Sequence, residues 1–169
     1  MTAAFRMEVL SSSHDRAAFR CGNDGIDRYF RETVTQDIKR RLAYCFVATE
    51  VATGKLAGFY TLTASSVLLN EIPDALRKQL PKRLPIGVAL IGWLGRHVDF
   101  KGTGIGEALL FDAFKRVGGA AVASHAVIVD AIDDKAAKFY SRYGFVSLSA
   151  DKPGRMYLPV ATALKAIEV

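Results

Sequence analysis

Lys101 to Gly106 read Lys-Gly-Thr-Gly-Ile-Gly, and their spacing is the clearest sign of chemistry in the chain. They stand between an apolar run, Val88 to Leu94, and a stretch with helical periodicity, Glu107 to Val117. Alternating glycines let a backbone approach a ligand closely, and the first turn of a helix offers N–H groups to phosphate oxygens. The loop therefore predicts a site for a pyrophosphate-bearing cofactor.

Two familiar nucleotide motifs do not fit this loop. A P-loop requires a lysine after its last glycine, yet Gly106 is followed by Glu107 and Ala108. A dinucleotide fingerprint requires a third glycine at position 107, which is glutamate. ATP, GTP and NAD are therefore disfavoured. On the loop alone, an ordinary tight strand-to-helix turn stays open as the alternative.

The composition indicates a globular protein. The chain has 169 residues, half of them apolar, which favours one domain over residues 1–169 with a sizeable core. Cys21 and Cys45 lack the spacing of a zinc site or a disulfide framework, so we expect two reduced thiols and no metal. No apolar stretch is long enough to cross a bilayer and the start lacks a signal-peptide block, which together predict a cytoplasmic protein.

The net charge of +6 is unevenly placed, which suits a polyanionic partner. The alternative is a solvated basic face that only maintains solubility. The basic groups are Lys39, Arg40 and Arg41; Arg77, Lys78, Lys82 and Arg83; and, near the start, Arg16, Arg20, Arg28 and Arg31.

Hydrophobic periodicity and turn residues predict the elements that must position the loop. In chain order they are a helix over Asp24 to Arg40, antiparallel strands over Ala43 to Thr49 and Leu56 to Ser66, a short helix over Pro73 to Leu80, a proline-punctuated loop over Pro81 to Pro85, a strand over Val88 to about Val98, a helix over Glu107 to Val117, a strand over His125 to Ala131, a helix capped by Asp133 that runs through Arg142, and strands over Phe145 to Leu148 and Arg155 to Val160. This order favours an α/β protein with locally parallel strands between Val88 and Ala131.

Two motifs in order resemble the GNAT acetyltransferases. Lys101, Gly104 and Gly106 occupy the defining places of the pattern Arg/Gln-x-x-Gly-x-Gly/Ala, with lysine as a departure that keeps the positive charge. The second is the Ala-x-x-Phe-Tyr-x-x-x-Gly-Phe segment from Ala136 to Phe145. The resemblance implies the GNAT fold, a central mixed, twisted sheet flanked by helices in a single domain, and acetyl-CoA as the cofactor.

The front half carries a narrower resemblance, to the GNAT toxins of bacterial type II toxin-antitoxin systems. It lies in His14-Asp15-x-x-x-Phe19-x-Cys21-Gly22, Ile26-Asp27-x-Tyr29-Phe30, Gly58 to Leu62 and Pro81 to Pro85. The resemblance implies acetylation of the α-amino group of aminoacyl-tRNA, which blocks translation. It also implies a homodimer and a ribbon-helix-helix antitoxin, through which alone the toxin would meet operator DNA.

The same resemblance assigns roles to particular residues. Tyr140 occupies the place of the tyrosine that protonates the departing thiolate of CoA, while packing on the sheet is its alternative. Asp133 is equally a CoA contact or only a helix cap. The residues expected at the cofactor are Leu94, Gly95, Arg96, Lys101, Gly102, Thr103, Gly104, Ile105, Gly106, Glu107 and Asp133. Those expected at tRNA are Lys39, Arg40, Arg41, Arg77, Lys78, Lys82, Arg83 and Arg96.

Several residues leave alternatives open. Arg96 stands where these toxins carry an apolar residue. His97 is expected at a solvated loop edge, with service as a base or at the tRNA backbone as the alternative, and His14 and His125 receive no role. Two further functions stay open: a GNAT that acetylates a small amine or a protein N-terminus, and a non-catalytic CoA-binding regulator.

Overall fold

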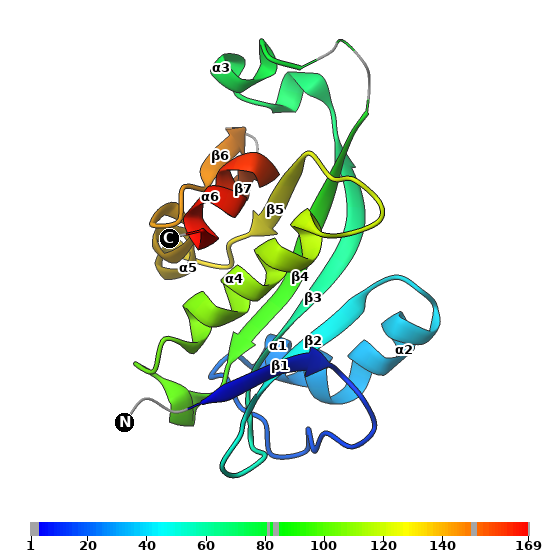
Figure 1. Ribbon diagram of the computed structural model, residues 1–169, viewed down its shortest axis with the longest axis vertical. Helices are drawn as coiled ribbons and strands as arrows, with labels where there is room; N and C mark the ends of the chain where they lie inside the picture. Colours follow the sequence, from blue (N-terminus) through cyan, green and yellow to red (C-terminus); the bar gives the residue numbers. More distant parts are fainter. Residues whose placement is uncertain (1–3, 81, 83–84, 150–151, 169) are drawn as a thin grey trace. The chain divides into compact units, whose positions relative to one another are not determined.

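A computed structural model describes residues 4–80, 82, 85–149 and 152–168. Its strands form one sheet in the order β1-β2-β3-β4-β5-β7-β6 (Figure 1). The strands are β1 (Phe5–Val9), β2 (Tyr44–Glu50), β3 (Leu56–Val67), β4 (Ile86–Arg96), β5 (Ala126–Asp130), β6 (Val146–Ser149) and β7 (Lys152–Pro159). The helices are α1 (Asp24–Arg28), the π-helical η1 (Tyr29–Thr33), α2 (Val34–Lys39), the short η2 (Leu69–Glu71), α3 (Asp74–Arg77), the short η3 (Val98–Phe100), α4 (Ile105–Gly118), α5 (Asp134–Ser141) and α6 (Val160–Ile167).

The fold divides into two compact units. The first comprises Met1–Thr63 and Gly92–Ala113, and the second Ala64–Ile91 and Phe114–Val169. Both contain strands with helices against them. This agrees with the predicted mixed sheet flanked by helices.

In the first unit, β1, β2 and β3 are antiparallel, with Met7 opposite Ala48 and Ala48 opposite Gly58. One side of these strands carries Cys45, Val47 and Phe59, which pack with the apolar side of α1, η1 and α2. The helical residues of this core are Ile26, Tyr29, Phe30 and Val34. The predicted amphipathic helix is therefore present, with a π-helical turn in its middle.

The other side of β3 meets the start of α4. A side chain at Gly58 would place its Cβ 2.7 Å from Leu109 Cδ1 and 3.3 Å from Ile105 Cγ2. Tyr60, two residues further along β3, donates a 2.6 Å hydrogen bond to Asp112 of α4. The absence of a side chain at Gly58 thus lets α4 begin close to the sheet.

In the second unit, β4 and β5 are parallel, with Val88 opposite Ala126 and Ile91 opposite Val129. This confirms the parallel pair expected from the helical crossover. β7 is antiparallel to both β5 and β6. The core of this unit is built from Val67, Ile72, Ile86, Val88, Ala126, Ile128, Leu148 and Tyr157.

The sequence prediction lacks β1 and α6, as well as the short helices η2 and η3. β1 alternates apolar residues with Arg6 and Glu8, which is a period-two pattern that is too short to stand out beside a chain terminus. α6 follows Pro159, where the prediction ends a strand at Val160. The predicted helix over Pro73 to Leu80 shortens to α3. Pro81 and Leu84 of the proline-punctuated loop lie outside the described residues.

No helix in the described ranges is both long and apolar enough to span a bilayer.

Replacement of Gly95 by alanine should destabilise the protein. The new Cβ would lie 2.8 Å from Phe59 Cε1 and 3.1 Å from Ile26 Cγ2, and both side chains are in the core. Overpacking of this kind costs about 1–3 kcal/mol of the free energy of unfolding, measurable by urea denaturation. Gly87→Ala in the same strand is the matched control because its Cβ would meet nothing within 4 Å. Equal losses for the two variants would contradict the packing argument.

Candidate functional site

The glycine loop connects the end of β4 to the start of α4 through η3 (Figure 1). Gly102 has a φ of 79° and Gly104 a φ of 83°, in the left-handed region that other residues avoid. A Cβ at either position would meet nothing within 4 Å. The glycines are therefore required by the backbone conformation, and the space beside the loop is open to a ligand.

The loop presents backbone amides in preference to side chains. Thr103 donates both its N–H, at 3.3 Å, and its hydroxyl, at 2.5 Å, to the carbonyl of Phe100. The first α-helical hydrogen bond of α4 runs from Ala108 N–H to the Gly104 carbonyl, at 3.0 Å. The amides of Ile105 and Gly106 precede it and have no acceptor within the helix. These N–H groups and the partial positive charge of the helix start suit an anion.

Buried side chains anchor the glycine loop at both of its ends. Phe100 is buried, with its ring centroid 5.7 Å from that of Phe5 and 5.9 Å from Lys55 Nζ. Ile105 is fully buried. Lys101, Gly102, Thr103 and Gly104 between them are exposed. The loop is thus fixed at both ends and open in the middle.

His97 is a buried residue that supports this connection, so the expectation of a solvated loop edge is wrong. It is only 4% exposed, and its ring packs edge-on against Phe19, at 5.5 Å between centroids. Its Nδ1 accepts the N–H of Asp99 at 3.1 Å, and the ring is also hydrogen-bonded to the backbone of Ala18. Burial lowers the pKa of His97, so the ring is neutral at pH 7. With both nitrogens engaged, it is not placed to serve as a base.

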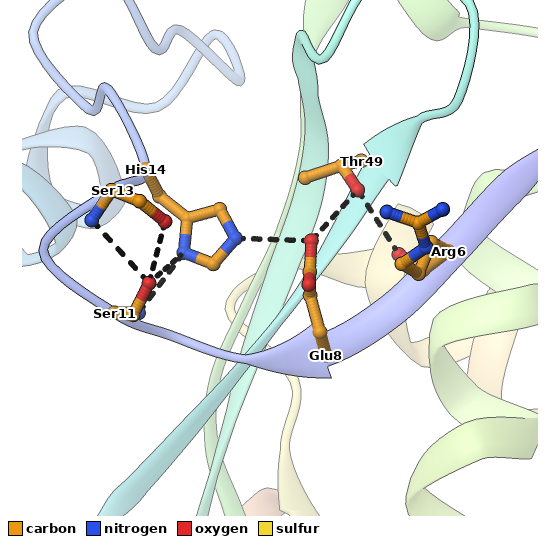
Figure 2. Close-up of polar contacts among 6 residues, drawn as sticks. All are labelled: Arg6, Glu8, Ser11, Ser13, His14 and Thr49. Carbon is orange, nitrogen blue, oxygen red and sulfur yellow. Dashed lines mark hydrogen bonds and ion pairs between the residues drawn. The ribbon is translucent and has the colours of Figure 1, made fainter.

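The other two histidines also have intramolecular partners. Figure 2 shows His14, whose Nδ1 accepts the Ser11 N–H at 2.9 Å and whose Nε2 lies 3.1 Å from Glu8 Oε1. Glu8 also accepts from the Thr49 hydroxyl at 3.1 Å, which ties the loop after β1 to β2. His125 Nε2 lies 2.6 Å from the Tyr157 hydroxyl. The partners of His14 lie within six residues of it in the chain, whereas Tyr157 is 32 residues from His125, so sequence spacing gives no signal of the second contact.

The end of β4 presents backbone amides alternately to its two sides. His97 donates its N–H to the Ala57 carbonyl at 2.8 Å, and Trp93 donates to the Thr61 hydroxyl at 3.1 Å, so both amides face β3. Successive residues of a strand point their N–H groups to opposite edges. The amides of Leu94 and Arg96 are therefore directed away from β3. Gly95, the third residue predicted here, packs closely against Phe59 and Ile26.

Tyr140 lies on α5, in the second unit, and is 8% exposed. Its ring is covered by Phe139 and Phe145, at 5.3 and 5.4 Å between centroids. Within the described residues its hydroxyl makes no hydrogen bond, and no fully buried side-chain oxygen there lacks one. The hydroxyl oxygen therefore reaches the accessible surface. Burial of the ring raises the pKa of Tyr140 to about 12, so the group is a protonated donor at neutral pH.

Asp133 is the N-cap of α5, as predicted. Its side chain accepts the N–H of Ala136 at 2.8 Å. The helix ends before Gly144, whose φ of 98° is the left-handed conformation expected after a helix. The cap alone accounts for an aspartate at position 133, and its contact with CoA stays a prediction.

The basic candidates are distributed over both units. Lys39, Arg40 and Arg41 end α2 in the first unit, where Arg96 is half-buried at the end of β4. Arg77 and Lys78 belong to α3 and its cap in the second unit, where Arg77 forms an ion pair with Asp74. Lys82 is exposed, and Arg83 lies outside the described residues. Ion pairing at Arg77 leaves the end of α2 as the stronger cationic cluster.

No group of three or more potential metal ligands occurs in the described part of the chain. Cys45 is buried and Cys21 half-buried, and burial raises the pKa of the Cys45 thiol to about 12 and that of Cys21 to about 11. Neither thiol is an activated nucleophile.

Two hollows of the first unit, of roughly 460 and 290 Å³, adjoin His14 and His97 and are not lined by the glycine loop.

Two proteins with sequences similar to this chain are toxins. The probable toxin TacT of Sinorhizobium fredii is 32% identical over 158 residues, which cover 88% of this chain and 87% of that protein. A tRNA-acetylating toxin of Mycobacterium tuberculosis is 30% identical over 138 residues, with coverages of 80% and 81%. No protein-family model matches the chain.

Solved structures show the same fold. A tyrosine-to-phenylalanine mutant of KacT matches with a TM-score of 0.88 at 22% identity, covering 96% of this chain and 99% of that one. AtaT complexed with acetyl-methionyl-tRNAfMet matches with a TM-score of 0.87 at 20% identity, covering 98% and 100%. An AtaT mutant bound to acetyl-CoA and the C-terminus of the antitoxin AtaR matches with a TM-score of 0.80 at 19% identity, covering 98% and 99%.

The buried His97 predicts a loss of stability in mild acid. Burial lowers the pKa of His97 in the folded state, so below pH 6.5 the unfolded chain binds a proton that the folded protein excludes. The free energy of unfolding therefore decreases as the pH is lowered. His97→Asn cannot titrate but keeps an acceptor for Asp99 N–H. Between pH 7.5 and 5.5, wild type should lose up to about 1.4 kcal/mol more than this variant in urea denaturation.

His125, whose pKa burial also lowers, is common to both proteins and cancels in this difference. Equal losses in wild type and His97→Asn would contradict the neutral, buried state of His97.

Proposed function

The chain belongs to the GNAT toxins that acetylate tRNA, and from this premise we propose that it transfers the acetyl group of acetyl-CoA to the α-amino group of charged tRNA. The modified aminoacyl-tRNA can no longer supply its amine to peptide synthesis, so translation stops. The observation that carries the proposal is that one chain has both an open, left-handed glycine loop and a surface-reaching tyrosine hydroxyl on a buried ring. Both lie in the motifs that identify the family.

Acetyl-CoA fits the glycine loop. Its pyrophosphate needs several N–H donors and a positive potential. The amides from Gly102 to Glu107, apart from that of Thr103, which bonds the Phe100 carbonyl, lie in the loop and the first turn of α4 and would supply them. Lys101 is exposed beside them and adds a positive charge. The bound group supplies an activated acetyl thioester. The loop residues would hold and orient it without taking part in bond making.

Tyr140 is the proton donor in this proposal. The amine nitrogen would attack the thioester carbonyl to form a C–N bond and a tetrahedral oxyanion, and collapse of this intermediate would break the C–S bond. The leaving sulfur would take a proton from Tyr140, and the proton that the nitrogen loses would return to Tyr140 or to solvent. A phenol that is protonated at pH 7 and has no competing partner within the described protein is suited to donate to that sulfur. Phe139 and Phe145 fix the ring, so the direction of the hydroxyl is set before the substrate arrives.

Backbone amides at the end of β4 would stabilise the negative charge on the carbonyl oxygen. The Leu94 and Arg96 amides point away from β3, while those of Trp93 and His97 are already used. Donors on a strand fixed by a packed core need no rearrangement during the reaction. We assign this role to the two amides and to no side chain.

Partners follow from the same family membership. One structural relative, AtaT, has been solved with the C-terminus of its antitoxin AtaR and with acetyl-CoA. We expect a ribbon-helix-helix antitoxin here as well, with operator DNA reached only through it, and a homodimeric toxin in the cytoplasm, where charged tRNA is found. We also treat residues 1–169 as one GNAT domain.

Tyr140→Phe should abolish most acetyl transfer while leaving the fold intact. Removal of one general-acid group lowers kcat by about 10²-fold or more. The assay is transfer of labelled acetyl groups from acetyl-CoA to charged tRNA, with acetyl-CoA affinity measured separately by calorimetry and expected to stay within about twofold of wild type. Tyr143→Phe, three residues away, is the matched control and should retain activity. Wild-type kcat in Tyr140→Phe would refute the role.

Gly104→Ala should weaken acetyl-CoA binding. Its φ of 83° is strained for alanine, so the loop would relax and misplace its amides. A loss of about 1.4 kcal/mol corresponds to a tenfold rise in Kd. Gly54→Ala is the control, since Gly54 has a φ of 73° and equally open surroundings in a different turn. Both variants should lose similar stability, and equal Kd values would contradict the assignment of the loop.

A further inference from the structure

A short turn joins α2 to β2 (Figure 1). Its residues combine cations with exposed apolar side chains. Lys39, Arg40 and Arg41 end the helix, and none of them makes an ion pair within the described residues. Leu42 is 55% exposed and Tyr44, the first residue of β2, is 52% exposed. We call these five residues the α2–β2 platform.

The backbone of the platform is strained at Arg41. Its φ of 57° is the one positive value among the described residues other than glycine. Leu42 N–H bonds the Asp37 carbonyl at 2.9 Å and Arg41 N–H bonds the Ile38 carbonyl at 3.1 Å, which is the helix ending that usually places glycine at this position. An arginine at position 41 makes the folded protein less stable than a glycine would. A side chain kept at such a position points to a function for it.

The side chain of Arg41 is directed at the exposed aromatic ring. Its Nη1 lies 3.4 Å from the Tyr44 hydroxyl and can donate to it. Val9, 58% exposed, lies opposite Phe46 in the β1–β2 register, on the same side of the strands as Tyr44. Tyr44 is thus half exposed, with the Arg41 guanidinium at its hydroxyl, and Lys39 and Arg40 immediately precede Arg41 in the chain.

We propose that the α2–β2 platform binds the tRNA of the charged substrate, with Tyr44 stacking on an exposed base and Arg41, Arg40 and Lys39 contacting phosphates. The proposal rests on the proposed function insofar as that function makes tRNA the substrate. Aromatic side chains stack on any base, and unneutralised cations beside them follow the backbone. Three unpaired cations at one turn match a polyanion better than a protein surface of mixed charge.

The platform is separate from the glycine loop. Tyr44 pairs with Leu62 in the β2–β3 register, whereas Ala48 pairs with Gly58, next to the start of α4. Four strand residues separate the two points, a distance of about 13 Å. A contact at this distance binds tRNA without touching the reacting atoms. Its loss should therefore raise KM for tRNA and leave kcat unchanged.

The test compares Tyr44→Ala, Tyr44→Phe and Arg41→Gly in steady-state acetylation of charged tRNA. Loss of one stacked base corresponds to a rise in KM of about 5- to 100-fold for Tyr44→Ala, with kcat and the KM for acetyl-CoA unchanged. Tyr44→Phe keeps the ring and should stay within about twofold of wild type. Arg41→Gly should raise the melting temperature, because the strain is relieved, and yet bind tRNA more weakly, with a salt dependence shallower by about one phosphate contact.

Unchanged KM for tRNA in Tyr44→Ala would overturn the proposal. So would altered oligomeric state or antitoxin affinity in that variant with normal KM, because the platform would then be a protein interface. If the wild-type protein acetylates no charged tRNA, the proposed function fails, but fluorescence anisotropy with uncharged tRNA still tests the platform. Weaker binding by Tyr44→Ala than by wild type would support it, and equal binding would overturn it.

Discussion

The structure depends on one constraint, which is that the chain must pass from a strand into a helix while leaving the first amides of that helix open. A turn that closed onto itself would consume those donors. Left-handed glycines at positions 102 and 104 carry the backbone around, and Thr103 satisfies its own groups on the Phe100 carbonyl. The buried ring of Phe100 anchors one end, and Gly58 lets α4 lie close to the sheet at the other. Buried apolar contacts thus support a polar opening that has little stability of its own.

In the proposed mechanism, burial sets both the position of the Tyr140 hydroxyl and its strength as an acid. A phenol with a pKa of about 12 is a weaker acid than a thiol, whose ordinary pKa is near 8.5, so full proton transfer from Tyr140 to a free thiolate would be uphill by more than about 4 kcal/mol. In the proposed mechanism the hydroxyl therefore hydrogen-bonds to the sulfur while negative charge develops there, and its proton passes to the sulfur as Tyr140 regains the proton that the amine nitrogen loses. The burial that fixes the ring makes the group a dependable donor, at the expense of acid strength.

The local parts of the structure could be predicted from sequence, and the parts that depend on tertiary contacts could not. Glycine spacing and periodicity predict the loop, α4, the Asp133 cap and the parallel strands, because those features depend on neighbours in the chain. His97 is read as solvated because nothing within a few residues shows that Phe19 and Ala18 cover it. Gly95 is identified from the sequence only as a candidate site residue, because nothing near it in the chain shows that the Phe59 ring of β3 packs against it. β1 alternates apolar and charged residues as a strand should, but five residues are too few for this pattern to predict a strand.

The use of all three histidines in internal contacts bears on the choice of acceptor. With the three histidines engaged in internal contacts, the proposed site relies on an amine that arrives already neutral. At pH 7 about a tenth of an ordinary α-amino group is neutral, against less than about a thousandth of a lysine side chain, a difference of roughly 200- to 400-fold. An amine next to an ester carbonyl is more acidic still, because the carbonyl withdraws electron density. The proposed site, with donors for the oxyanion and the thiolate and with none of the three histidines unengaged, would therefore favour the α-amino groups of aminoacyl esters over lysine by proton chemistry, before any contact with the rest of the tRNA is considered.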